Sequence, residues 1–221
     1  NAKKPVFLIG GGVNIAHANK EILRLVELTG VPVVTTIMGK GAVPTTHSLY
    51  VGNLGIHGSY AANSAVSNCD LLFSIGTRFN DRITGNIEKF ASGARIIHID
   101  IDASAISRNI VVDVPIVADA KKAICSLLEK AEPLSVSGWV DEINRWKKEY
   151  PIDMGKSGLT PQMVIEAVNE TFMDAVIATD VGQNQLWATQ FLALDENRQM
   201  LTSGGLGTMG YGLPAAIGAK L

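Results

Sequence analysis

Along residues 5–130, short apolar runs that end in glycine or a polar residue alternate with amphipathic stretches. Such runs are typical of parallel strands covered on both faces, and the stretches between them are typical of crossover helices. Residues 18–29 place apolar side chains at helical spacing, and Gly30 follows as a C-terminal cap. The alternation predicts an α/β fold with a doubly wound parallel sheet. Its predicted strands are residues 5–10, 31–36, 70–76, 94–101 and 116–117.

The segments between these strands differ in length and composition. Residues 37–58 are predicted to be a loop, too long for a mere connection, and residues 59–67 a short Ala-rich helix. Asp119 is suited to cap a helix that ends near residue 128. We therefore predict one domain over residues 1–130.

The pattern changes after residue 130. Residues 131–158 hold two prolines, several serines and a Trp-, Lys- and Glu-rich stretch, and we predict a linker that carries one surface helix. A second α/β alternation begins at Thr160, a predicted N-cap, with Pro161 at the first helical position. It extends over residues 159–221, too little chain to close a core of its own, so we expect a piece of a longer protein.

Composition excludes several classes of function. The 221 residues carry 19 basic and 21 acidic side chains, without the basic cluster of a nucleic-acid-binding protein. No run of about 18 apolar residues predicts a membrane span. Cys69 and Cys125 form neither a CxxC pair nor a disulfide framework, so we expect both in the core of a cytoplasmic protein.

Candidate ligand-binding residues follow the predicted strands, because ligands of open α/β sheets bind beyond the carboxyl ends of the strands. The triplet Gly10-Gly-Gly12 is suited to a phosphate but lacks the GxGxxG spacing, and a tight turn would explain it equally well. Arg78 and Arg82 could pair with phosphate or carboxylate, or could simply be solvated. Asp100 could accept ribose hydroxyls. Together these positions favour a nucleotide-like ligand.

The second unit contains the most unusual stretch, residues 203–216, in which glycines are interleaved with Leu206, Met209 and Tyr211. A flexible linker would be polar, so this loop is predicted to fold against a flat ligand. Residues 180–185 lie between a predicted strand and a predicted helix, a position that suits an anion. We find no residues at metal-ligand spacing and no GxSxG motif.

Four stretches carry a resemblance over essentially the whole chain. They are Leu54-Gly-Ile-His-Gly58, Arg78-Phe-Asn-Asp-Arg-Ile-Thr-Gly85, Val181-Gly-Gln183 and the glycine-rich segment 202–218. With them the chain resembles the acetolactate synthase (acetohydroxyacid synthase) family of thiamine-diphosphate enzymes. The resemblance implies a Rossmann-like central FAD-binding domain and the beginning of a C-terminal diphosphate-binding domain. It also implies decarboxylation of pyruvate and its ligation to a second 2-oxoacid, in the synthesis of branched-chain amino acids.

The resemblance assigns roles to particular residues. Asp81 and Arg82 would bind substrate. The residues implied to contact FAD are Gly11, Thr36, Ile37, Leu54, Gly55, Ile56, His57, Gly76, Thr77, Arg78, Phe79, Asn80, Asp100, Ile101, Asp119 and Ala120. Those implied to contact thiamine diphosphate are Gln183, Asn184, Gly207, Thr208 and Met209. The Mg²⁺ ligands and the activating glutamate of the family would lie outside these 221 residues, so the chain alone is expected to be inactive.

Three positions depart from the family pattern. Asn184 stands where the family usually has His, Asn80 where it commonly has Asp, and Lys40 where it more often has Leu. The family further implies a homo-oligomer, a dimer or tetramer, with a possible regulatory small subunit. Alternatives are another flavin-associated thiamine-diphosphate enzyme (pyruvate oxidase or glyoxylate carboligase), an NAD-dependent deacylase, or a non-catalytic nucleotide-binding domain.

Overall fold

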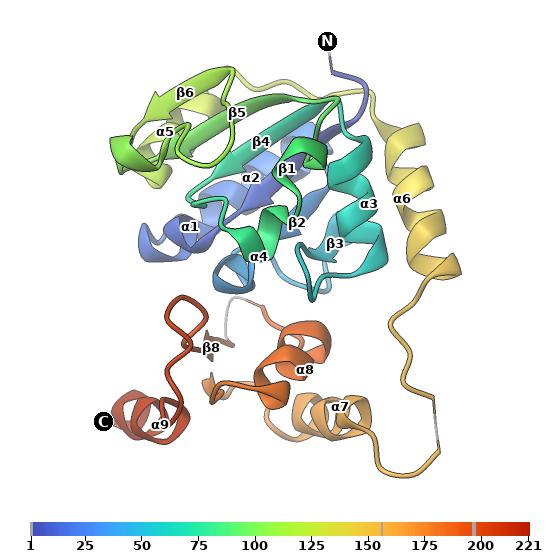
Figure 1. The fold of residues 1–221 in the computed structure, drawn as a ribbon, viewed down its shortest axis with the longest axis vertical. Helices are drawn as coiled ribbons and strands as arrows, with labels where there is room; N and C mark the ends of the chain where they lie inside the picture. The colour runs from blue at the N-terminus through green and yellow to red at the C-terminus, as the bar shows by residue number, and fades with distance from the viewer. Residues whose placement is uncertain (1, 156, 196–197) are drawn as a thin grey trace.

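The computed structural model describes residues 2–155, 157–195 and 198–221. Its larger part is a six-stranded sheet in the order β3-β2-β1-β4-β5-β6, in which every neighbouring pair is parallel. Figure 1 shows this sheet with helices packed around it. The predicted doubly wound α/β fold is thereby confirmed. The strands are β1 (Pro5–Ile9), β2 (Val33–Thr35), β3 (Tyr50–Asn53), β4 (Leu71–Ile75), β5 (Arg95–Asp100) and β6 (Val114–Val117).

Helices cover both faces of the sheet because successive side chains of each strand point to opposite sides. In β1, Val6 and Leu8 belong to one apolar cluster, and Phe7 and Ile9 belong to the other. The first cluster is closed by α3 and α6, and the second by α2 and α5. The helices of this part are α1 (Gly11–Ile15), α2 (Asn19–Thr29), α3 (Tyr60–Asn68), α4 (Asp81–Thr84), α5 (Ala120–Leu128) and α6 (Ser137–Glu149), with 3₁₀ turns η1 (Ile37–Gly39), η2 (Ile87–Lys89) and η3 (Ala103–Ala105).

Helix α6 is the helix predicted on the linker, and it packs against the sheet domain. Trp139 and Ile143 are buried in the same cluster as Val6 and Leu8. The indole Nε1 of Trp139 donates a hydrogen bond to the Pro5 carbonyl at 3.1 Å. Figure 1 shows α6 running along α3 at one side of the sheet. The described chain between residues 137 and 149 is therefore structurally part of the first unit.

The second unit is small. Strands β7 (Ile177–Ala178) and β8 (Met200–Leu201) form a two-stranded parallel sheet, accompanied by helices α7 (Pro161–Thr171), α8 (Gln183–Phe191) and α9 (Gly212–Lys220). Thr160 caps α7 by accepting a hydrogen bond from the Met163 amide, and Pro161 begins the helix as predicted. Among the described helices, none has the length and apolar composition needed to cross a bilayer.

Two expectations from the sequence are wrong. The loop predicted at residues 37–58 contains the edge strand β3, whose four residues include Gly52 and pair irregularly with β2. So short a run with a central glycine carries no strand periodicity. Cys125 is exposed on α5, although Cys69 is buried as expected. A helix exposes one face to solvent, and Cys125 lies on it.

Candidate functional site

The glycine turn between β1 and α1 packs on the turn after β4. The Gly12 amide donates to the Gly76 carbonyl at 3.0 Å, and the Gly10 amide donates to the Ile75 carbonyl at 2.9 Å. A Cβ atom added to Gly12 would lie 2.7 Å from the Gly76 Cα. Close chain packing therefore explains Gly10 and Gly12 without a ligand. Both turns lie where the strand order reverses, at the carboxyl ends of the central strands.

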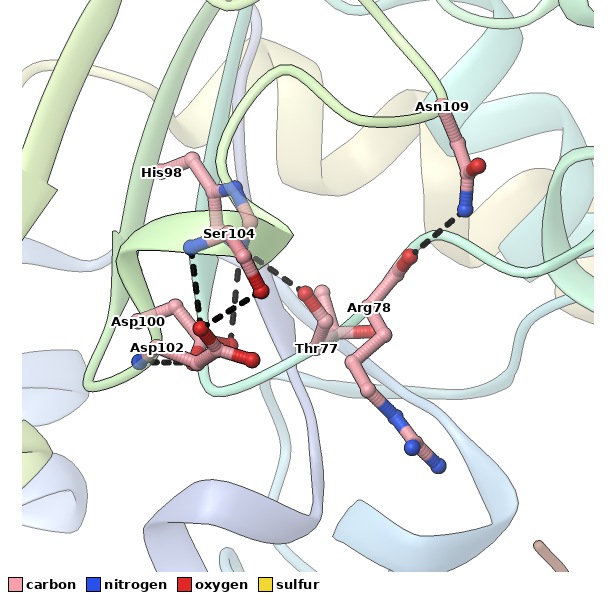
Figure 2. Close-up of polar contacts among 7 residues, drawn as sticks. All are labelled: Thr77, Arg78, His98, Asp100, Asp102, Ser104 and Asn109. Atoms are coloured by element: carbon pink, nitrogen blue, oxygen red, sulfur yellow. Dashed lines mark hydrogen bonds and ion pairs between the residues drawn. The ribbon is translucent and has the colours of Figure 1, made fainter.

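Residues 77–79, which follow β4, are held in place by contacts with His98 of β5. His98 is fully buried, and its Nε2 lies 2.8 Å from the Thr77 carbonyl oxygen, as Figure 2 shows. The ring of Phe79 packs edge-on against the imidazole at 4.9 Å between centroids. Asn109 donates to the carbonyls of Arg78 and Phe79 at 3.1 and 3.0 Å. These contacts fix the backbone of residues 77–79 while leaving the Arg78 guanidinium to point away from His98 (Figure 2).

The carboxylate of Asp100 lies beside this segment at the end of β5. One oxygen accepts the Asp102 amide at 2.9 Å, and the other lies 3.8 Å from His98 Nε2. Burial lowers the pKa of His98, which favours the neutral imidazole. A neutral ring that donates from Nε2 to the Thr77 carbonyl leaves the Asp100 side-chain oxygens free to accept from further hydroxyl donors.

The turn after β3 is joined to the segment that contains Asp81 and Arg82. The Ile56 amide donates to the Arg82 carbonyl at 2.9 Å. The Asn63 side chain both accepts from the Gly55 amide and donates to its carbonyl, at 2.9 and 3.0 Å. Asp81 and Arg82 begin the short helix α4 with exposed side chains. A cavity of about 320 Å³ opens here, lined by Leu54, Gly55, Ile56, Asn63, Asp81, Ile83, Thr84 and their neighbours.

All residues implied to contact FAD lie at or directly after the carboxyl ends of the six parallel strands. Gly11 follows β1, Thr36 and Ile37 follow β2, Asp100 is the last residue of β5, and Ile101 follows it. The Asp119 carboxylate accepts the Lys122 amide and so caps α5, as predicted. Residues 54–57 follow one outermost strand, and residues 119–120 follow the other. The implied FAD residues therefore form one continuous edge rather than a compact pocket.

In the second unit, Asp180 joins the two segments implied to hold thiamine diphosphate. Its carboxylate accepts the amides of Val181, Gly210 and Gly212 at 2.7, 2.9 and 3.1 Å. These three hydrogen bonds lower the pKa of Asp180. The end of the glycine-rich loop, at residues 210–212, is thereby tied to the turn before α8. The sequence does not indicate this role for Asp180, because two of its three partners lie 30 and 32 residues away.

Gln183 and Asn184 begin helix α8, directly after Gly182. Amide N–H groups in the first turn of an α-helix have no intrahelical acceptor and carry the positive end of the helix dipole. Met209 has 82% of its surface exposed, and Leu206 has 94% exposed. The unit therefore presents amide donors at the beginning of α8 and an uncovered apolar surface on the glycine-rich loop.

The two candidate cofactor segments meet at η1. A Cβ atom on Gly204 would lie 2.7 Å from Met38 Sδ and 3.0 Å from Ile37 Cγ2. One on Gly205 would lie 3.9 Å from an Arg78 guanidinium nitrogen. The glycine-rich loop thus begins against residues that follow β2 and β4. Among the described residues, no group of three or more His, Cys, Asp and Glu side chains could hold a metal ion.

Comparison with known proteins gives a consistent result. The central domain of thiamine pyrophosphate (diphosphate) enzymes matches residues 1–127, and their C-terminal thiamine-pyrophosphate-binding domain matches residues 180–221. The chain is 43% identical to a probable acetolactate synthase large subunit of Methanococcus aeolicus and 43% identical to the acetolactate synthase large subunit of Cyanidium caldarium, with 100% of the chain covered in both. It is 46% identical, over 99% of its length, to the acetolactate synthase large subunit of Corynebacterium glutamicum. The matches cover 40%, 39% and 36% of these three relatives.

Proposed function

Because the chain belongs to the thiamine pyrophosphate enzyme family, we propose that it is part of an acetolactate synthase large subunit. That enzyme would join pyruvate to a second 2-oxoacid, giving acetolactate or acetohydroxybutanoate for branched-chain amino acid synthesis. The observation that carries the proposal is the meeting of the two implied cofactor segments at η1, together with identity to named large subunits over the whole chain. In this proposal residues 1–130 are the central domain, 131–158 are a linker whose helix α6 packs on that domain, and 159–221 are the first part of the diphosphate-binding domain.

FAD is the ligand we propose for the carboxyl edge of the six-stranded sheet. Residues 54–57 and 119–120 follow the two outermost strands. Five inter-strand spacings of roughly 4.8 Å place these strands about 24 Å apart. An edge of that length suits an extended dinucleotide better than a mononucleotide. Asp100 retains acceptor capacity for a ribose hydroxyl, and backbone amides after the strands suit the diphosphate. The residues present therefore fit FAD.

Thiamine diphosphate is the ligand we propose for the second unit. Gln183 and Asn184 would donate to its diphosphate, and Gly207, Thr208 and Met209 would contact its aminopyrimidine. Asp180 supports this arrangement, because it ties the glycine-rich loop to the turn before α8. The cofactor supplies the carbanion chemistry, and the protein binds and orients it.

The described residues do not fit Mg²⁺, and no step of the proposed chemistry uses it here. In the complete enzyme we propose that Mg²⁺ is held by residues beyond these 221. Asp81 and Arg82 are the proposed substrate residues. Arg82 offers a guanidinium that could pair bidentately with the carboxylate of a 2-oxoacid. Its exposed position beside the 320 Å³ cavity leaves it accessible to a small anion.

We also propose a cytoplasmic homo-oligomer, a dimer or tetramer, with a regulatory small subunit as a further partner. Free cysteines are compatible with a reducing compartment. Large apolar side chains exposed on the second unit, such as Leu213 at 73% and Phe172 at 53%, support further protein contacts there. The proposal includes neither nucleic acid nor a membrane as partner.

The test is the activity of the complete protein encoded by the reading frame that contains this chain. With thiamine diphosphate, Mg²⁺ and FAD, we expect pyruvate alone to give acetolactate, and pyruvate with 2-oxobutanoate to give acetohydroxybutanoate as well. Arg82→Lys should raise the KM for the second substrate at least tenfold, because an ammonium cannot form the bidentate pair. Arg108→Lys, a change at another exposed arginine, is the control and should be neutral. Acetate production from pyruvate, or ligation of glyoxylate, would assign the chain to a related enzyme instead.

A further inference from the structure

Lys40 is a buried lysine that the proposed chemistry does not use. Only 6% of its surface is exposed, and its Nζ donates to the carbonyl oxygen of Thr189 in α8 at 2.6 Å. Asn53 donates to the same oxygen at 2.6 Å from the end of β3. Two donors of the first unit thus converge on one carbonyl in the last turn of α8. Carbonyls of that turn lack intrahelical partners and carry the negative end of the helix dipole.

These contacts continue into a network of buried polar groups on both sides. In the first unit, Thr35 donates to the Asn53 side-chain oxygen at 2.8 Å, and Thr35 directly precedes the implied FAD residue Thr36. In the second unit, the Thr189 hydroxyl donates to the Gln185 carbonyl at 2.7 Å. The side chains of Thr35, Asn53 and Thr189, which make these hydrogen bonds, are all buried.

The network ends next to the glycine-rich loop. Gln185 donates from Nε2 to the Thr202 hydroxyl at 2.7 Å, and Thr179 donates to the same hydroxyl at 2.8 Å. Thr202 lies two residues before Gly204, where that loop begins to contact η1. We call the set of Thr35, Lys40, Asn53, Thr179, Gln185, Thr189 and Thr202 the bridging network.

Hydrogen bonds of this kind set geometry more strictly than apolar contacts do. A buried amine costs free energy unless it is paired, and a satisfied buried network favours one arrangement of its members. Helix α8 is held in a second place as well, since Gln190 donates to the carbonyl of His57 in the implied FAD segment. Its opposite end carries Gln183 and Asn184. The position of the proposed diphosphate site is therefore linked to two segments of the proposed flavin edge.

We propose that Lys40 and Asn53 are positioning residues that couple FAD binding to thiamine diphosphate binding through the bridging network. This inference rests on the proposed function. FAD would order the residues after β2 and β3, and the ordered segment would hold α8 in the orientation that binds the diphosphate. Coupling of two sites is reciprocal, so thiamine diphosphate would raise the affinity for FAD by the same factor.

The experiment measures the dissociation constant of thiamine diphosphate, with Mg²⁺ present, in the complete protein with and without saturating FAD. In the unsubstituted protein we expect FAD to lower that constant at least fivefold, roughly the lower end of typical coupling. We call the dissociation constant of thiamine diphosphate without FAD, divided by that with FAD, the coupling ratio. In Lys40→Met this ratio should lie within about twofold of one. The dissociation constant of FAD, measured without thiamine diphosphate, should stay within about twofold of its value in the unsubstituted protein.

Lys147→Met is the matched control. Lys147 also donates to a backbone carbonyl, that of Tyr50 at 2.9 Å, but within the first unit. It should keep the full coupling ratio. Thr202→Val is a second variant of nearly equal volume that breaks the network near the glycine-rich loop, and it should also lose coupling. Circular dichroism and thermal unfolding identify a variant that fails to fold, and Thr202→Val then carries the test.

The outcomes separate the inference from the proposed function. If neither FAD nor thiamine diphosphate binds to the unsubstituted protein, the proposed function fails. If both bind but independently, or if Lys40→Met and Thr202→Val keep the ratio, the coupling is refuted and the proposed function stands. An equal loss in Lys147→Met would also overturn the inference, since it would show a general effect of removing a lysine.

Discussion

Gly76 shows how much a single residue position contributes to this fold. Its φ of +64° lies in the left-handed region, and a Cβ atom there would lie 2.6 Å from the Gly12 Cα. Glycine is therefore required by the backbone conformation and also by close packing of two turns. The family resemblance implies that Gly76 contacts FAD, and the structure shows in addition that the packing of the two turns requires glycine there.

Gly76→Ala is expected to lower the free energy of unfolding by about 2–5 kcal/mol, the sum of the left-handed backbone cost and an unrelieved clash. Urea unfolding of both proteins, followed by circular dichroism, measures this difference. Gly93→Ala is the control, because an added Cβ there would meet nothing within 4 Å. A loss below 0.5 kcal/mol for Gly76→Ala, on the order of an ordinary surface substitution, would show that the two turns can separate without cost.

At the scale of elements, helix α8 links the two units of the chain. Its last turn receives Lys40 and Asn53, and its side chain Gln190 reaches the carbonyl of His57. Burial lowers the pKa of Lys40 to about 7 from an ordinary value of 10.5. Between these two values the unfolded chain binds more protons than the folded one. The contribution of Lys40 to stability must therefore increase as the pH rises through that range.

We expect the free energy of unfolding to increase by about 2 kcal/mol more between pH 7 and pH 9 in the unsubstituted protein than in Lys40→Met. Below pH 7 the two proteins should respond similarly to pH, since Lys40 then carries its proton in both the folded and the unfolded state. Urea titrations at intervals of one pH unit measure this difference. Parallel pH profiles from pH 7 to pH 9 would contradict the expectation.

At the scale of the whole molecule, the first unit includes helix α6. Trp139 and Ile143 complete a cluster that also contains residues of β1, β2 and β4. Lys4 adds an ion pair with Glu142 at 2.8 Å. The packed unit thus does not end at the compositional change after residue 130, because helix α6 packs along α3 before the chain reaches the second unit (Figure 1).

A truncated chain of residues 1–150 should therefore be more stable than one of residues 1–130. Loss of buried Trp139 alone is expected to cost about 3–5 kcal/mol. Urea unfolding measures the stability of each chain, and titration of flavin fluorescence measures the binding of FAD. Residues 1–150 with Trp139→Ala should behave like the shorter chain. Equal stability of residues 1–130 and 1–150 would show that α6 packs without stabilising the sheet.

Local signals made much of the fold predictable. Apolar runs identified five of the six strands of the main sheet, and the caps at Asp119 and Thr160 were identified correctly. Strand β3 was missed because its register comes from pairing with β2 rather than from its own four residues. Asn63, His98 and Asp180 were not predicted as supports of the candidate site. Each acts on backbone groups of a neighbouring segment, which only the folded chain brings within reach.

The sequence by itself determined the layered α/β architecture, the positions of residues at strand ends and the family to which the chain belongs. Periodicity, caps and motifs are local, so they can be recognised before the chain is folded. Only the tertiary structure decided that Lys40 contacts Thr189, 149 residues further along the chain. Such a contact depends on the packing of two units. Burial makes a hydrogen bond there electrostatically stronger than it would be in water.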